Sequence, residues 1–216
     1  MAQPLSRADV LGVFVKVPTP GHVKTRLAQT VGADHAAALY RFIGRQVVAQ
    51  CVDPGGHRTA IWFAPSGGEA GTRAWLEWLG VDDFLSQPDG GLGVRLTATF
   101  DHHFAHGARR VVVIGSDCPD VGRELVHRAF AALEQDDLVV GPAVDGGFYL
   151  LGLNSPAPEL FRDIEWSTDA VYRQTMTNAG RLGLSMAVLP ELQDVDTVDD
   201  ARALGLLPPV SRGQLE

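Results

Sequence analysis

The sequence predicts an α/β protein with a doubly wound, mostly parallel sheet and helices on both faces. Short apolar, Val-rich runs, such as residues 10–16 and 109–116, alternate with longer segments of helical periodicity, such as residues 34–51. This alternation is typical of βαβ units. Their right-handed crossovers place helices on both sides of a single sheet.

The remaining elements continue the alternation. A strand is expected over residues 58–65, then helices over 69–80, closed by Gly80, and about 94–106. Beyond the strand at 109–116, we expect a helix over 123–135 and two strands around the turn at 144–147. A helix over 167–183, a strand over 184–190 and a short helix over 197–205 complete the series.

Composition and charge restrict the class of protein. The 216 residues are 45% hydrophobic and 20% charged, which predicts one globular domain over 1–216, with a core of about 10–205 and a tail at 206–216. There is no long apolar run and no basic leader before an apolar stretch, so we expect a cytoplasmic protein without a membrane partner. The net charge of −8 argues against nucleic acid but allows a single nucleotide. Cys51 and Cys118 are expected to be reduced thiols.

Charged residues follow several of the predicted strands. In doubly wound sheets, ligands bind beyond the carboxyl ends of the strands, so these residues are expected to meet at one edge. The set consists of two cations and four carboxylates: Lys24, Arg26, Asp117, Asp145, Asp194 and Asp196.

The segment "PTPGHVKTR" after the first strand is the candidate phosphate site. Pro20, Gly21, Lys24 and Arg26 are assigned to nucleotide binding, because two cations at a helix start suit a di- or triphosphate. The alternative is a helix start with solvated basic residues. Cations at a helix N-terminus oppose the macrodipole by roughly 0.3–1 kcal/mol each, which favours the functional interpretation.

Asp117, in "IGSDCPDVG", is the candidate ligand of Mg²⁺ or Mn²⁺. The alternative is a role in capping the next helix, which we assign instead to Asp120. Cys118 is interpreted as a packing residue and not as a nucleophile. Asp194 and Asp196, two apart in an extended segment, point to the same side, and one of them could complete the metal site; the alternative is an acidic cluster that only caps the next helix. Thr197 is expected to cap the terminal helix.

The turn "VDGG" allows two interpretations: a plain hairpin, or an acceptor site in which Asp145 faces the substrate and Gly146 and Gly147 allow close approach. The other acceptor candidates are Trp166, Ser167 and Thr168, with Ser167 or Thr168 as an alternative helix cap.

Two further segments carry nucleotide or metal candidates. Gln87 and Gly93, in the loop "SQPDGGLG", are candidates for contact with a base, with an ordinary loop as the alternative. His102, His103 and His106 cluster near the end of a predicted helix. The spacing of His102 and His106 is compatible with zinc, but no third ligand is evident, and a solvated helix end is expected there.

Five motifs together resemble a known family. "KVPTPGHVKTRL", "IGSDCPDV", "VDGGFYLLGL", "IEWST" and "DVDTVDD" occur in the order seen in a bacterial family of glycosyltransferase-like proteins of unknown function. That family belongs to the nucleotide-diphospho-sugar transferase superfamily, which has the GT-A fold. Weaker similarity extends to 2-phospho-lactate guanylyltransferase and molybdenum-cofactor guanylyltransferase.

The resemblance implies a role for each motif. Lys24 and Arg26 would hold the donor phosphates, Asp117 and Asp196 would share the metal, and Asp145 would lie in the acceptor half. The first motif departs from the longer Gly-rich stretch usual in nucleotidyltransferases, because Pro18 and Pro20 offer no N–H to a phosphate. This departure leaves room for a nucleotide sugar.

Three functions remain open at this point. The first is metal-dependent glycosyl transfer from a nucleotide sugar to a small-molecule acceptor, with Lys24, Arg26 and Asp145 as the catalytic residues. The second is nucleotidyl transfer from a nucleoside triphosphate to a phosphorylated acceptor, with release of pyrophosphate. The third is a non-catalytic nucleotide-binding protein, which the number of carboxylates at one edge disfavours.

Overall fold

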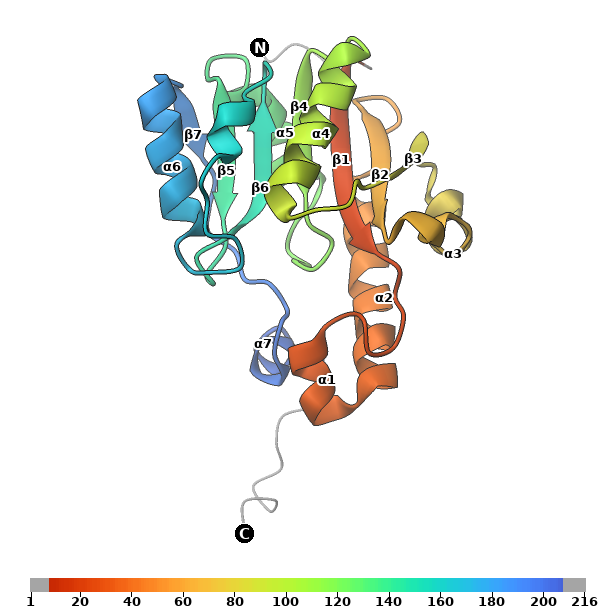
Figure 1. The fold of residues 1–216 in the computed structure, drawn as a ribbon. Coiled ribbons are helices and arrows are strands. Elements are labelled where there is room, and N and C mark those ends of the chain that lie inside the picture. The colour runs from red at the N-terminus through yellow and green to blue at the C-terminus, as the bar shows by residue number, and fades with distance from the viewer. Residues whose placement is uncertain (1–7, 208–216) are drawn as a thin grey trace.

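The computed structural model describes residues 8–207 and contains a seven-stranded sheet between two layers of helices (Figure 1). Its strands are β1 (Asp9–Lys16), β2 (Arg58–Ala64), β3 (Asp83–Ser86), β4 (Arg110–Ile114), β5 (Leu138–Pro142), β6 (Phe148–Leu153) and β7 (Met186–Val188). The start of the chain and residues 208–216 of the predicted tail lie outside the described residues.

The sheet is mostly parallel, as the alternation of strands and helices predicts. The spatial order is β3-β2-β1-β4-β6-β5-β7, and β6 runs antiparallel to both of its neighbours. The other pairings, including those of β1 with β2 and β4, are parallel. The carboxyl ends of β1 and β4 therefore lie side by side near the centre of one edge of the sheet.

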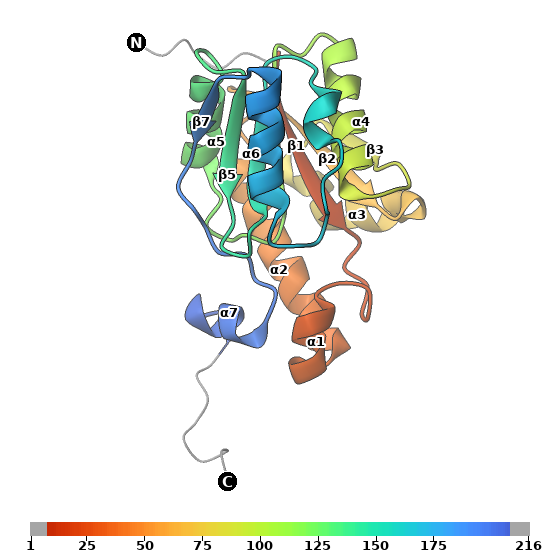
Figure 2. The ribbon, with the colours of Figure 1, turned by 60° about the vertical axis from the view of Figure 1, so that its left-hand side comes forward.

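The larger helices cover both faces (Figures 1 and 2). They are α2 (Ala33–Cys51), α3 (Glu69–Leu76), α4 (Leu92–Ala105), α5 (Arg123–Ala132) and α6 (Val171–Leu182). One hydrophobic core lies between the sheet and α2, α3 and α5, and a second lies between the sheet, α4, α6 and the 3₁₀ turn Pro158–Phe161. None of the helices in residues 8–207 is long and apolar enough to cross a bilayer.

Two short helices lie beyond the carboxyl ends of the strands. α1 (Thr25–Val31) and α7 (Val198–Ala203) contact each other below the sheet in the view of Figure 1. Thr197 caps α7 as predicted, in a capping box: its side chain accepts from Asp200 N, and the Asp200 carboxylate accepts from Thr197 N. This box also fixes the backbone next to Asp196.

Several local predictions are wrong. The strand β3 was not predicted, because its four residues are half-buried or exposed at a sheet edge and show no alternation of apolar and polar residues. Asp120 does not cap α5, which begins at Arg123 with Gly122 as its N-cap. Neither Ser167 nor Thr168 caps α6, whose N-cap is Ala170. The helix predicted over 69–80 ends at Leu76 and continues as a 3₁₀ turn, closed by Gly80 as expected.

The histidines at the end of α4 are only partly solvated, contrary to expectation. His103 is buried and accepts a hydrogen bond from Trp62 Nε1 at 3.0 Å. Burial lowers the pKa of His103 to about 3, so it packs as a neutral ring. Both cysteines are free thiols, as predicted, and are fully buried, which fits the packing role assigned to Cys118.

Candidate active site

A pocket of about 720 Å³ opens at the carboxyl ends of the central strands. Most of the residues predicted from the sequence contribute to its lining: Lys24, Arg26, Gln87, Asp117, Asp145, Gly147, Trp166, Ser167, Thr168, Asp194 and Asp196. Pro20, Gly21, Gly93 and Gly146 do not line it. The expected convergence of distant segments at one edge is therefore present in the structure.

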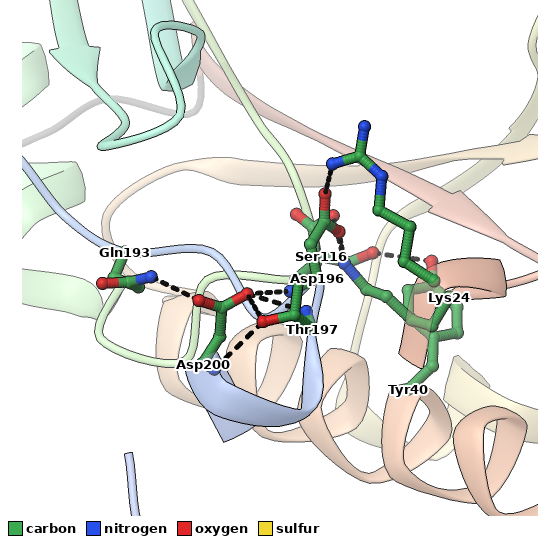
Figure 3. Close-up of polar contacts among 9 residues, drawn as sticks. Lys24, Tyr40, Ser116, Gln193, Asp196, Thr197 and Asp200 are labelled. Atoms are coloured by element: carbon green, nitrogen blue, oxygen red, sulfur yellow. Dashed lines mark hydrogen bonds and ion pairs between the residues drawn. The ribbon is translucent and has the colours of Figure 1, made fainter. Parts of the chain in front are cut away.

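The Lys24 ammonium lies between two carboxylates (Figure 3). Its Nζ is 3.0 Å from Asp117 Oδ2 and 2.7 Å from Asp196 Oδ1, and the side chain is only 6% exposed. Burial alone lowers the pKa of Lys24, but the charges and hydrogen bonds of Asp117 and Asp196 outweigh burial and hold the pKa above its ordinary value. Lys24 is therefore a permanent cation that joins residues 93 and 172 positions away along the chain.

The backbone at Lys24 is strained. Lys24 is the N-cap of α1 and adopts a left-handed conformation with φ 46° and ψ 50°. A non-glycine residue in this region costs of the order of 1–3 kcal/mol, so the surrounding contacts must hold it there. Ser167, with φ 66°, is a second pocket residue in this region. Strain of this kind concentrates at functional sites.

Two residues that we did not predict lie beside Asp117. Tyr40, on α2, accepts a hydrogen bond from Lys16 N at 2.9 Å. Its hydroxyl also lies 2.9 Å from Ser116 Oγ (Figure 3). Ser116 precedes Asp117, so this chain of contacts fixes the start of the loop after β4. Ser116 could have been noticed beside Asp117 in the sequence, whereas Tyr40 stands in an amphipathic helix with nothing to distinguish it from a core residue.

Asp194 carries the strongest sign of an incomplete site. Its Oδ1 is buried and has no hydrogen-bond partner. Burial, together with the charges of Asp117 and Asp145, raises the pKa of Asp194 to about 7. The three carboxylates are therefore close enough to repel one another, and a further cation would relieve that repulsion.

Asp196 is held by its own loop. Its backbone N donates to Asp200 Oδ2 at 3.1 Å, and Asp200 also accepts from Thr197 N and from Gln193 Nε2 (Figure 3). These hydrogen bonds lower the pKa of Asp200, against the opposing effect of burial. The Asp200 carboxylate thus fixes the backbone of Asp196, whose side chain reaches Lys24.

Arg26 supplies a more available cation than Lys24. Its Nη1 is 4.0 Å from Asp196 Oδ2, and its side chain is 75% exposed. Lys16 and Arg95 also line the pocket, although the sequence analysis did not select them. Arg95 is partly engaged, since Nη1 donates to Gln87 Oε1 and Nε donates to Gly90 O. Arg26 is therefore less engaged by the protein than Lys24 and Arg95 are.

Asp145 lies in a hairpin turn and contributes to the lining of the pocket. β5 and β6 pair on either side of this turn, and Asp145 Oδ1 accepts from Gly147 N at 2.8 Å. Gly146, at φ 87°, packs so closely that an added Cβ would collide with the backbone of Asp169. The freedom of Gly146 thus serves packing of the turn and not, as we predicted, approach by a ligand.

Gln87 and Gly93 also have structural roles. Gln87 Nε2 donates to Trp62 O at 2.7 Å and to Val15 O at 3.4 Å, which leaves no N–H for a base edge. Gly93 makes room for Trp166, because an added Cβ would lie 2.9 Å from the indole ring. The Trp166 side chain can therefore pack beside α4 and form one wall of the pocket.

The donor chemistry of the pocket fits a divalent cation. Asp117, Asp194 and Asp196 offer carboxylate oxygens, the ligands that Mg²⁺ and Mn²⁺ prefer, and Asp194 Oδ1 is buried without a partner. A second group of side chains that could bind a metal lies elsewhere, and its ligand atoms are closer together than those of the pocket carboxylates. Within residues 8–207, one ligand atom each of Asp53, His57 and His127 lie within 4.8 Å of one another, outside the pocket.

The topology and the position of the pocket define the class of fold: a nucleotide-diphospho-sugar transferase fold of the GT-A type. A protein of Desulfovibrio desulfuricans G20, provisionally assigned as a nucleotide-diphospho-sugar transferase, is 36% identical, with a TM-score of 0.86 over 92% of this chain and 87% of that chain. The inositol-1-phosphate CTP transferase of T. maritima is 10% identical, with a TM-score of 0.55 over 95% and 96% of the two chains.

A third similar structure is Rv0371c of Mycobacterium tuberculosis H37Rv in complex with manganese. It is 18% identical, with a TM-score of 0.52 over 90% of this chain and 97% of that chain. No curated protein sequence matches the chain significantly. The profile of the bacterial family DUF2064, described as an uncharacterized protein conserved in bacteria, matches residues 47–168. The chain belongs to this family.

Proposed function

We propose that this protein is a metal-dependent transferase that uses a nucleotide-activated donor, and that it transfers a glycosyl group from a nucleotide sugar. One observation carries the proposal: Lys24 bridges Asp117 and Asp196 in a pocket that also holds the unpartnered Asp194 Oδ1. The arrangement combines a fixed cation with surplus carboxylate oxygens, which suits a metal–diphosphate group. The 36% identical protein, provisionally assigned as a nucleotide-diphospho-sugar transferase, supports a transferase of this class.

Each charged group has a distinct task in this proposal. Asp117 and Asp196, with Asp194 beside them, would hold Mg²⁺ or Mn²⁺. The chemistry supplied there when the ion is bound is neutralisation of the charge that develops on the departing nucleoside diphosphate. Lys24 keeps the two carboxylates in place and reduces their repulsion. Arg26, largely exposed, contacts the donor phosphates from the mouth of the pocket.

Asp145 is the residue that we assign to the acceptor. Gly147 N occupies its Oδ1 and fixes the carboxylate, and Oδ2 is then available to orient an acceptor hydroxyl and to take its proton. Trp166, Ser167 and Thr168 form the nearby wall, where Thr168 Oγ1 donates to Glu165 O and holds the turn closed.

Nucleotidyl transfer from a nucleoside triphosphate is the second candidate. The observation that favours it is the number of cations: Lys16, Arg26 and Arg95 line the pocket in addition to Lys24. A triphosphate carries more charge than a nucleotide sugar and would engage more of these side chains. The product distinguishes the two reactions, since this reaction releases pyrophosphate and glycosyl transfer releases a nucleoside diphosphate.

The deciding experiment measures products and binding together. The protein, with Mg²⁺ or Mn²⁺, is incubated with panels of nucleotide sugars and nucleoside triphosphates and with mixed sugar, polyol and phosphorylated acceptors. Nucleoside diphosphate released from a nucleotide sugar supports the proposal. Pyrophosphate released from a triphosphate overturns it in favour of the second candidate. Binding without either product supports the non-catalytic alternative.

Asp117→Ala tests the metal role directly. We expect metal-dependent nucleotide binding to weaken by about 100-fold or more, because a residue that coordinates the ion directly should matter at least as much as the residues that orient its ligands. Calorimetry with and without Mg²⁺ measures this loss. The matched control is Asp120→Ala, which removes an exposed carboxylate three positions away and outside the pocket. Equal affinity in the Asp117 variant and the control would remove the metal role.

A further inference from the structure

A second group of metal-type ligands lies next to the amino end of β2, whereas the pocket opens at the carboxyl ends of the strands. Asp53 follows the end of α2, His57 precedes β2, and His127 lies on α5. One ligand atom from each of the three side chains lies within 4.8 Å of the other two. None of them lines the pocket. Segments separated by 70 or more positions are thus joined here by side chains suited to a transition metal.

His57 is the central member of the group. Its ring is 1% exposed, and Nε2 lies 3.1 Å from the backbone carbonyl of Cys51. Because a carbonyl only accepts, Nε2 carries the proton, and Nδ1 is left with a free lone pair. Nδ1 is buried and has no hydrogen-bond partner. A histidine whose second ring N–H donates to a carbonyl is the usual arrangement of a metal ligand.

The remaining contacts keep His57 uncharged and orient the group. Burial lowers the pKa of His57 to about 4, so its ring is uncharged at neutral pH. Asp53 Oδ2 lies 2.9 Å from His127 Nε2, and the hydrogen bond from His127 lowers the pKa of Asp53 against the effect of burial. Arg123 also acts on Asp53 electrostatically, but its Nη2 donates to Val52 O at 2.8 Å. The Asp53 carboxylate therefore remains available toward the two imidazoles.

We propose that Asp53, His57 and His127 form a binding site for a divalent transition metal of the zinc class. His57 Nδ1, His127 Nε2 and an Asp53 oxygen supply three ligands, and water completes a tetrahedral shell. Two imidazoles and one carboxylate favour Zn²⁺ over Mg²⁺, in contrast to the all-carboxylate set of the pocket. The site is independent of the proposed transfer reaction.

The bound ion would link the turn at residues 53–57 to α5. Asp53 and His57 bracket the turn "DPGGH", in which Asp53 O accepts from Gly56 N and His57 N. His127 adds α5, which packs on the same face of the sheet. Side-chain exposures of 21% for Asp53 and 41% for His127 leave a route for the ion from solvent. Binding therefore stabilises the folded state by mass action.

The test uses the full-length protein without a histidine tag, freed of metal with a chelator. Zn²⁺ is titrated in the presence of excess Mg²⁺, which occupies carboxylate sites. We expect one Zn²⁺ per chain, a rise in Tm of about 5–10 °C at 100-fold excess over Kd, and visible absorption of tetrahedral Co²⁺ when cobalt replaces zinc. No bound Zn²⁺ in the unmodified protein overturns the proposal.

The variants identify the ligands. His127→Gln can still donate to Asp53 but does not bind zinc, so we expect affinity to fall by about 100-fold or more with little change in the metal-free Tm. Asp53→Asn should weaken binding in the same direction, whereas His57→Ala risks the fold and is not needed. The control is the double variant His102→Ala, His106→Ala, which removes another close histidine pair, with ring centroids 4.3 Å apart. If only this control loses Zn²⁺, the assignment is wrong.

Discussion

Two ion networks in this molecule differ in how completely their hydrogen bonds are satisfied. At the amino end of β4, Arg110 donates through Nε and Nη2 to both oxygens of Asp9 at 2.8 and 2.7 Å, and through Nη1 to Phe130 O and Glu134. At the pocket, Lys24 joins Asp117 and Asp196, but Asp194 Oδ1 has no partner and Arg26 stays mostly exposed.

The difference separates a structural ion pair from a candidate site. Arg110 and Asp9 are 2% and 0% exposed, and the guanidinium fork matches the carboxylate with two parallel hydrogen bonds. The pocket network is more open, with Asp117 and Asp196 side chains 37% and 42% exposed. Charges that a fold needs only for stability are paired within the protein. Charges left over at a concave surface are available to a ligand.

The largest expected effect breaks the structural network. Arg110→Met removes the guanidinium and leaves Asp9 buried without its principal partner, so we expect the free energy of unfolding to fall by about 3–5 kcal/mol. Urea denaturation measures this loss. Arg109→Ala is the matched control, because Arg109 is 52% exposed and 3.9 Å from Asp9, where an ion pair contributes under about 1 kcal/mol. Similar losses in both variants would contradict the distinction.

The sequence predicted the pocket better than the roles of its individual residues. Lys24, Asp117 and Asp196 were expected to meet because each follows a strand or its continuation at one edge of a parallel sheet, and the topology brings them together. That Lys24 would bridge both carboxylates could not be predicted, since it depends on a left-handed backbone at φ 46°.

The roles that were mispredicted depend on distant packing. Gly93 makes room for Trp166, and Gly146 for the backbone of Asp169, contacts that no local pattern reveals. The group of Asp53, His57 and His127 was missed for the same reason: each residue is ordinary in its own segment, and only the packing of α5 beside the end of α2 unites them.

A smaller effect tests whether the pocket carries an uncompensated charge. The pKa of Asp194 is about 7 in the folded protein against an ordinary 3.8, so the folded state holds this proton more tightly than the unfolded state. The stability that this tighter proton binding contributes is fully present at low pH and is lost as the pH rises through about 7. Asp194→Asn removes this dependence. The difference in free energy of unfolding, Asp194→Asn minus the unmodified protein, should therefore increase by about 2 kcal/mol as the pH rises from about 5 to 8.

Urea titrations at several pH values measure the Asp194 effect, and Asp199→Asn is its control. Asp199 is 88% exposed on α7 and should show no such gain. Excess Mg²⁺ should reduce the gain at high pH, because a bound cation stabilises the ionised Asp194. A pH-independent difference between Asp194→Asn and the unmodified protein would mean that this carboxylate is already compensated, as Asp9 is.

The smallest effect on stability is expected at Arg26. Because this side chain belongs to the open pocket network, its removal should weaken nucleotide binding without destabilising the fold. Its side chain is 75% exposed and reaches only Asp196, at 4.0 Å, so Arg26→Ala should change the free energy of unfolding by less than about 0.5 kcal/mol. Nucleotide affinity should fall about 10-fold, the effect of one lost charge-assisted contact. Arg41→Ala, which removes an equal charge from α2 outside the pocket, should leave affinity unchanged. Calorimetry at low and high salt compares them; equal affinities in both variants would show that Arg26 holds no phosphate.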